Sequence, residues 1–417
     1  MYTIAAHSIL VVAFTLRILS RDELLPPSRM AWFMVVLTLP FIGSALYFLF
    51  GEVDLGHRAR SQHQRIFAAI HAFARQTIAE PDDLDNLVKP RFMAAFKYAR
   101  SINGFNPQPG NRAELMPDAQ SARMRLIKDI DAAAETVHIL YYIWLEDKTG
   151  TNTAKALIRA AKRGVTCRVM VDGLGSRAFT RSDLWQQMAQ AGVQLAIALP
   201  INRPIRTILT SRLDMRNHRK ITVVDGKIAY CGSQNCADTA FRVKAKYAPW
   251  VDIVLRLQGP VVAQKQMLFA SDWMKENNTP VEELHIAPQP ARGGFVAQAL
   301  GDGPTERMRA SPHMFVTLIE TAQDELIITT PYFVPDPTVF EALCAAALRQ
   351  VKVKLVVPRH NDSWVVATAS KSFYRKLLES GAQIYEYSGG LLHAKTLTVD
   401  GQLLFMVRPT WICAALI

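Results

Sequence analysis

The feature that most constrains the fold is an internal repeat of strand-like and helix-like segments. In the first copy, the apolar run 136–144 is followed by a helical stretch and by a second strand-like run at 166–172. The same order recurs about 190 residues later, from 325–333 to 351–357. Strands that alternate with helices predict an α/β fold with parallel strands and right-handed crossovers. The repeat is too long for a solenoid, so we expect two fused domains, each with a mixed sheet flanked by helices.

A short polar motif stands at the equivalent point of each copy. Each motif reads His-x-Lys, then four residues, then Asp-Gly. The residues are His218, Lys220 and Asp225 in the first copy and His393, Lys395 and Asp400 in the second. Side chains two apart on an extended chain face the same side, so the histidine and lysine of one motif can both address one phosphate group. Lysine supplies positive charge to the oxygens, and histidine is suited to be a nucleophile or a general acid near neutral pH.

The repetition of this motif indicates one shared site, because a single His-x-Lys would usually be a surface accident. Ser233 and Asn235, just past the first motif strand, can add a hydroxyl and an amide to the phosphate oxygens. Asp252 lies in the strand-like run APWVDIVLRL, where it either orients a motif histidine through Nδ1, as a triad carboxylate does, or is an edge-strand carboxylate. For Asp225 and Asp400, turn capping is favoured over direct chemistry.

These motifs resemble the phospholipase D superfamily, whose signature is HxK-x4-D followed by GSxN. The apolar N-terminus and the segments YYIW, PYFVP and SGAQIYEY together resemble bacterial cardiolipin synthases. The resemblance implies two fused phospholipase D-like domains with facing half-sites, and a phosphatidyl-histidine intermediate formed without metal or other cofactor. It also implies that two phosphatidylglycerols become cardiolipin and glycerol. His218 and His393 would then share the nucleophile and acid/base roles in an order left open, while Lys220, Lys395, Ser233 and Asn235 would bind phosphate.

The N-terminal residues 1–50 predict a transmembrane helical hairpin. Residues 30–50 are apolar and uncharged, which is long enough to span a bilayer as one helix, although a buried core helix is the alternative. Residues 3–20 are a weaker second span, with a signal peptide as the alternative reading. The basic segment 57–65 favours a cytoplasmic, anionic leaflet, so we expect a multi-pass protein of the bacterial inner membrane. Residues 51–118 are expected to be a juxtamembrane connector.

The charge balance narrows the choice of partner. A net charge of +12 points to polyanions, which admits both phospholipids and nucleic acid. The apolar N-terminus favours anionic phospholipid and a membrane over nucleic acid, and the resemblance implies phosphatidylglycerol as the main phospholipid partner. A basic stretch just ahead of the first motif is either a solvated face or a headgroup site; it comprises Arg203, Arg206, Arg212, Arg216 and Arg219. A hydrolase or transferase that uses another acceptor, a superfamily nuclease and an inactive remnant remain the alternatives.

The C-terminal residues depart from the motif. The first domain is expected over 119–290, and the second, over 291–417, is expected to be incomplete. By analogy with the first copy, Gly and Ser should stand at 407 and 408, but the chain has Val407 and Arg408. In another reading frame, the codons of Met406 and Val407 force Gly at 407, and the following codons permit the rest of the motif. We therefore infer a frameshift around Leu404–Met406, which puts the activity in doubt; a naturally divergent tail is the alternative.

Overall fold

The chain divides into two compact units, which are considered separately. One comprises residues 1–62 with 201–216, and the other comprises 63–200 with 217–417. The computed structural model describes residues 2–21, 24–51, 57–77, 86–200, 216–301, 307, 309–406 and 410–415, with no side-chain description for 57–59, 77 and 410–415.

The larger unit is built on one sheet of 14 strands among the described residues, and the order of these strands displays the repeat. The first copy contributes β1 (Gln108–Leu115), β2 (Thr136–Tyr141), β3 (Thr166–Asp172), β4 (Gln194–Ala198), β5 (Ile221–Val224), β6 (Ile228–Gly232) and β8 (Val254–Gln258). The second contributes β9 (Phe295–Gly301), β10 (Glu325–Thr329), β11 (Lys352–Pro358), β12 (Gln383–Tyr387), β14 (Thr396–Val399), β15 (Leu403–Met406) and β16 (Thr410–Ala415).

The two halves of the sheet mirror each other about the antiparallel pair β1 and β9. Outward from this seam, the order is β8-β6-β5-β2-β3-β4 on one side and β16-β15-β14-β10-β11-β12 on the other. In each half, the three outer strands are parallel and the motif strand, β5 or β14, runs antiparallel to its outer neighbour. The expected duplication and mixed sheets are therefore confirmed, and the two copies share one continuous sheet.

Helices flank the sheet, and several of them begin at a capping aspartate. In the first copy they are α6 (Ala119–Asp131), α7 (Lys148–Lys162), α8 (Asp183–Gln190) and α10 (Val261–Asn277), and in the second they are α11 (Ala310–Glu320), α12 (Pro337–Leu348) and α13 (Trp364–Glu379). Asp118, Asp147 and Asp336 accept hydrogen bonds from backbone N–H groups at the starts of α6, α7 and α12.

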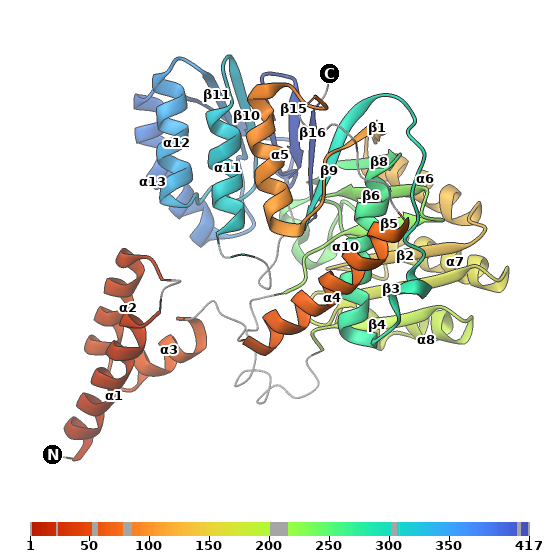
Figure 1. Cartoon of the computed structure of the whole chain (residues 1–417). Coiled ribbons are helices and arrows are strands. Elements are labelled where there is room, and N and C mark those ends of the chain that lie inside the picture. Colours follow the sequence, from red (N-terminus) through yellow and green to blue (C-terminus); the bar gives the residue numbers. More distant parts are fainter. Residues whose placement is uncertain are drawn as a thin grey trace. The chain divides into compact units, whose positions relative to one another are not determined.

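The segment expected as a connector takes part in both hydrophobic cores. Phe67, Ile70 and Ala74 of α4 (His57–Thr77) pack in the core beneath the first copy's sheet. By contrast, Phe92 and Phe96 of α5 (Pro90–Asn103) pack with residues of the second copy, and α5 contacts α11 and β9 (Figure 1). The first copy's N-terminal flank therefore completes the core of the second copy.

The smaller unit holds three apolar helices, α1 (Tyr2–Leu19), α2 (Pro26–Thr38) and α3 (Ile42–Phe50). The expected single helix over 30–50 is wrong: the chain leaves the helix between α2 and α3, at Pro40, whose ring cannot continue a regular helix. Of the helices within the described residues, α1 alone, with 18 residues, is long and apolar enough to cross a membrane by length and composition. Trp32 and Tyr47 pack edge to face in the small core of this unit.

Candidate active site

The two motifs occupy matching places in the sheet. His218 and Lys220 immediately precede β5, and His393 and Lys395 immediately precede β14. Both lysines are buried, and each donates a hydrogen bond from Nζ to the carbonyl of the histidine two residues before it, over 3.1 Å in the first copy and 2.5 Å in the second. The lysine and histidine of each motif therefore form one local unit, as the spacing predicts.

An aromatic ring accompanies each lysine. Lys220 Nζ lies 5.8 Å from the ring centre of Tyr142, and Lys395 Nζ lies 5.9 Å from the ring centre of Tyr332. The Tyr142 ring also stands edge-on to His218, with ring centres 4.0 Å apart. These tyrosines are better described as walls of the site than as catalysts, since their rings face the motif side chains.

The second motif is held by a segment of the first copy. β7 (Trp250–Val251) pairs in parallel with β13 (Leu391–Leu392), and the carbonyl of Val251 accepts hydrogen bonds from the N–H groups of His393 and Ala394 at 2.8 and 3.0 Å. The Trp250 ring lies against the His393 ring, with ring centres 4.6 Å apart. The two copies therefore meet at the second motif.

Asp252 lies directly beneath His393. Its Oδ1 accepts a hydrogen bond from His393 Nδ1 over 2.6 Å and another from Ser233 Oγ over 2.5 Å. The contact between Asp252 and a motif histidine was one of the two alternatives that the sequence left open. Ser233 is expected to bind phosphate. In this structure its hydroxyl group donates its hydrogen bond to the Asp252 carboxylate, so Ser233 positions Asp252.

The electrostatic setting keeps Asp252 charged and His393 neutral. Burial lowers the pKa of His393 below its usual 6.5; Asp252 opposes this, while the charges of Lys395 and Lys220 reinforce it. Burial acts to raise the pKa of Asp252, but His393, Ser233 and Lys395 together hold it below its usual value. With Nδ1–H donated to Asp252, neutral His393 has Nε2 available as a base or nucleophile. The influence of Lys220 also places the first motif's charge near the second motif's histidine.

The motif aspartates bind backbone N–H groups, which is the arrangement that turn capping requires. The Asp225 carboxylate accepts hydrogen bonds from the N–H groups of residues 134–136, just before and at the start of β2, at 2.8–3.0 Å. Asp400 likewise accepts hydrogen bonds from the N–H groups of residues 323–325, and it forms an ion pair with Arg91 over 2.8 Å. Both aspartates have positive φ, so they close the turn after the motif strand and tie it to the neighbouring strand.

The remaining residues that the sequence predicts for the site are Asn235 and the basic stretch. Asn235 is buried beside a cavity that Lys220 also lines, and its Oδ1 has no hydrogen-bond partner among the described residues. Arg219 is not on a solvated face, because it is buried and forms an ion pair with Asp272 of α10 over 2.9 Å. Arg216 is also buried. The other basic-stretch arginines, Arg203, Arg206 and Arg212, lie outside the described residues, as do Val407 and Arg408.

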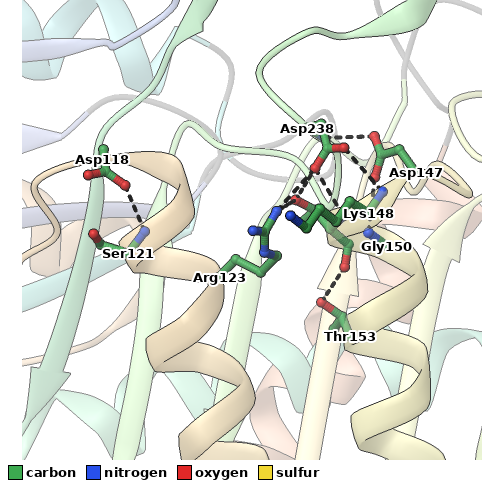
Figure 2. Close-up of polar contacts among 9 residues, drawn as sticks. Asp118, Ser121, Arg123, Asp147, Lys148, Gly150, Thr153 and Asp238 are labelled. Carbon is green, nitrogen blue, oxygen red and sulfur yellow. Dashed lines mark hydrogen bonds and ion pairs between the residues drawn. The ribbon is translucent and has the colours of Figure 1, made fainter.

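A carboxylate network that the sequence reading missed holds the loop after the first motif. Figure 2 shows Asp238 at the first turn of α7, where it accepts hydrogen bonds from Lys148 N, Thr149 N and Thr149 Oγ1 at 2.6–3.1 Å. Arg123 approaches the same carboxylate to 3.4 Å, and Asp238 N donates to Asp147 over 2.7 Å. Asp238 lies three residues after Asn235 in the sequence. This short spacing from a motif residue was the signal by which Asp238 could have been identified as part of the site. The network fixes the loop that carries Ser233 and Asn235 to α7.

Comparisons with known proteins agree with this geometry. The family model for the cardiolipin synthase, PLD-like domain matches residues 126–273 and 315–407, and that for the phospholipase D-nuclease N-terminal region matches 9–52. Cardiolipin synthase A of Serratia proteamaculans is 34% identical over 95% of this chain and 82% of its own length, and that of Yersinia pseudotuberculosis is 33% identical over 96% and 83%.

Among solved structures, the chain resembles phosphatidylserine synthase of Haemophilus influenzae, with a TM-score of 0.54 at 13% identity. The match covers 77% of this chain and 86% of that one, and at this identity it supports the fold alone. Taken with the paired motifs in a mirrored sheet, these matches show that the chain belongs to the cardiolipin synthase family of the phospholipase D superfamily.

Proposed function

We propose that the protein is a cardiolipin synthase, which transfers a phosphatidyl group from one phosphatidylglycerol to another and releases glycerol. The observation that carries this proposal is the assembly around His393. Its imidazole comes from the second copy, its orienting carboxylate, Asp252, comes from the first, and the charges of Lys220 and Lys395 act on it together. A neutral imidazole beside two lysines suits attack on an anionic phosphodiester.

The reaction then proceeds in two balanced steps. In the first, Nε2 of one motif histidine attacks phosphorus, a P–N bond forms, and the P–O bond to glycerol breaks as the other histidine donates a proton to the leaving oxygen. In the second, the latter histidine removes the proton from the hydroxyl of a second phosphatidylglycerol, whose oxygen attacks phosphorus and releases the first histidine. The lysines stabilise the charge on the phosphate oxygens in both steps.

The choice of acceptor is tested by the products formed from phosphatidylglycerol labelled in its acyl chains. The full chain, reconstituted in vesicles, should convert the label to cardiolipin and release glycerol in equal amount. Free phosphatidate without cardiolipin would instead identify a hydrolase. Lack of both products, with a His218→Gln variant behaving in the same way as the wild type, would support the inactive remnant.

We further propose that the protein is anchored in the bacterial inner membrane through its apolar N-terminus, with its catalytic copies in the cytoplasm, and that nucleic acid is not a substrate. The family and the apolar N-terminus support membrane association, and the basic segment 57–65 favours the cytoplasmic side. Protease digestion of intact and opened spheroplasts tests the orientation. Cleavage within 119–290 that requires opened spheroplasts is expected, whereas cleavage in intact spheroplasts would contradict the proposed orientation.

A further inference from the structure

Three surface segments of the larger unit present apolar side chains to solvent, and they are here called the rim. The rim comprises residues 242–247, which form a 3-10 helix, residues 331–336, and residues 359–365, of which Trp364 and Val365 begin α13. Trp364 is 80% exposed, Val365 67%, Val243 65% and Val334 50%. Isolated exposed apolar residues are common, but a tryptophan and three valines gathered on adjoining loops indicate a surface that is covered in use.

Contacts between the loops show that they form one surface. Lys244 of the first copy forms an ion pair with Asp362 of the second over 2.5 Å. Asn361, next to Asp362, donates a hydrogen bond to the carbonyl of Pro331. These two contacts join the three segments. They lie one residue along the chain from Val243 and no more than three residues from Val334 and Trp364.

The charge of the rim matches an anionic surface. Its three segments contain two acidic residues, and both are engaged: Asp362 with Lys244, and Asp336 with Arg309 over 3.0 Å. Arg242, Lys246 and Arg359 are exposed on the same segments. A surface with exposed tryptophan and valine and an excess of basic residues has the composition of an interfacial membrane contact, in which the basic residues attract anionic lipid.

The rim also adjoins the candidate active site. The ring of Tyr332 lies beside Lys395, and a cavity of about 260 Å³ is lined by Tyr332, Val334 and Lys395. On the other side, residues 242–247 lead within a few residues to Asp252, which holds His393. A lipid whose acyl chains remain in the bilayer beneath the rim would therefore have its headgroup phosphate close to the motif lysines.

We propose that the rim is a second membrane contact of this protein, at which Trp364, Val365 and Val243 enter the interfacial layer of an anionic bilayer and bring phosphatidylglycerol to the site. This inference rests on the proposed function for its substrate, but not for the contact itself. The contact is separate from the apolar N-terminal helices, since all of its residues belong to the larger unit.

The contact is tested with the full chain in proteoliposomes that contain phosphatidylglycerol brominated in its acyl chains. Bromine quenches tryptophan only at close range, so a Trp364→Phe variant should lose a quenched part of the wild-type emission. The matched control is Trp185→Phe, because Trp185 packs against Phe179 at a core cluster of the first copy and should contribute unquenched emission. Equal fractional quenching of the wild type and Trp364→Phe would overturn the proposal. A Trp364 emission that shifts with protein concentration in the absence of lipid would overturn it in favour of a contact between copies of the chain.

The catalytic consequence is tested by surface-dilution kinetics. Trp364→Gln should raise about tenfold the surface concentration of phosphatidylglycerol that gives half-maximal rate. Its rate on short-chain phosphatidylglycerol, dissolved below the micelle concentration, should stay unchanged. Leu348→Gln is the control, because Leu348 is 70% exposed at the other end of α12 from the rim. An equal loss on both substrates would contradict the proposal, whereas a wild type inactive on both would contradict the proposed function and leave the quenching result to decide the contact.

Discussion

Replacing Asp252 with Asn tests whether the carboxylate from the first copy prepares the histidine of the second. The substitution keeps the shape of the side chain and an oxygen that can accept from Ser233, so the free energy of unfolding should fall by only about 1–2 kcal/mol. The charge that complements the imidazole as it gains a proton is lost, and an amide can also stabilise the wrong tautomer. We expect kcat to fall about 10³-fold, which corresponds to about 4 kcal/mol in the barrier.

The pH dependence separates this role from a merely structural one. The negative charge of Asp252 raises the pKa of His393, against the lowering by burial and by the lysines. Removing that charge must lower the pKa of His393 further. The limb of the pH–rate profile that belongs to His393 should therefore move to lower pH: the acid limb if neutral His393 is the active form, and the alkaline limb if the protonated form is.

The assay is the formation of labelled cardiolipin by reconstituted full-length protein between pH 5 and pH 9, with thermal unfolding measured on the same samples. Ser233→Ala is the matched control, since it removes the other hydrogen bond to Asp252 Oδ1 but leaves the charge. It should lower kcat about tenfold without moving the His393 limb. An Asp252→Asn variant that keeps more than about a tenth of the wild-type kcat, or whose profile does not move, would refute the reasoning.

Three further predictions concern the rest of the site. The first prediction uses a labelled phosphatidyl substrate whose leaving group needs no proton. Of the variants His218→Gln and His393→Gln, the one that keeps the nucleophilic histidine should still form a labelled covalent adduct, and the other should not. Adducts on both variants would exclude a single nucleophilic histidine. Asp225→Asn and Asp400→Asn should each lower the free energy of unfolding by about 1–3 kcal/mol, because several backbone N–H groups lose a charged acceptor. Although burial acts to raise it, the N–H groups and Arg91 hold the pKa of Asp400 below 3.8, so its stabilising effect should be full above that pH and vanish as pH falls further. The free energies of unfolding of the wild type and Asp400→Asn, measured in urea, should therefore become equal in strong acid. A difference that stays constant with pH would contradict this. Asp238→Asn should raise the KM for phosphatidylglycerol more than it lowers kcat, as the loop that carries Asn235 loosens, and an unchanged KM would count against the loop assignment.

The repeat and its motif could be predicted because they depend on local pattern. The β-branched runs around Thr222 and Thr398 indicate strands, and the same polar spacing in both indicates one kind of site. The partner of His393 could not be fixed, because Asp252 reaches it through the pairing of β7 with β13, which joins residues 141 positions apart. No periodicity within the chain encodes that pairing.

Other differences have equally physical reasons. The uncharged stretch 30–50 has the length of a span, but Pro40 breaks the helix, and composition alone does not locate the break. Arg219 looked like part of an exposed basic stretch, yet it is the middle residue of His-x-Lys and points to the opposite side, where α10 supplies Asp272. The ion-pair partner of Arg219 is determined by the packing of α10, which the motif does not show.

The placement of α5 has a consequence for the order in which the chain can fold. Its apolar face, with Phe92 and Phe96, is synthesised early, but its partners in α11 and β9 follow much later; Tyr98 donates a hydrogen bond to the carbonyl of Ala310, 212 residues away. Until those residues leave the ribosome, the helix exposes a surface that can bind the wrong partner. We therefore expect α5 to lack its native partners while the first copy is synthesised, and the need for chaperones to be greatest before β9 and α11 emerge.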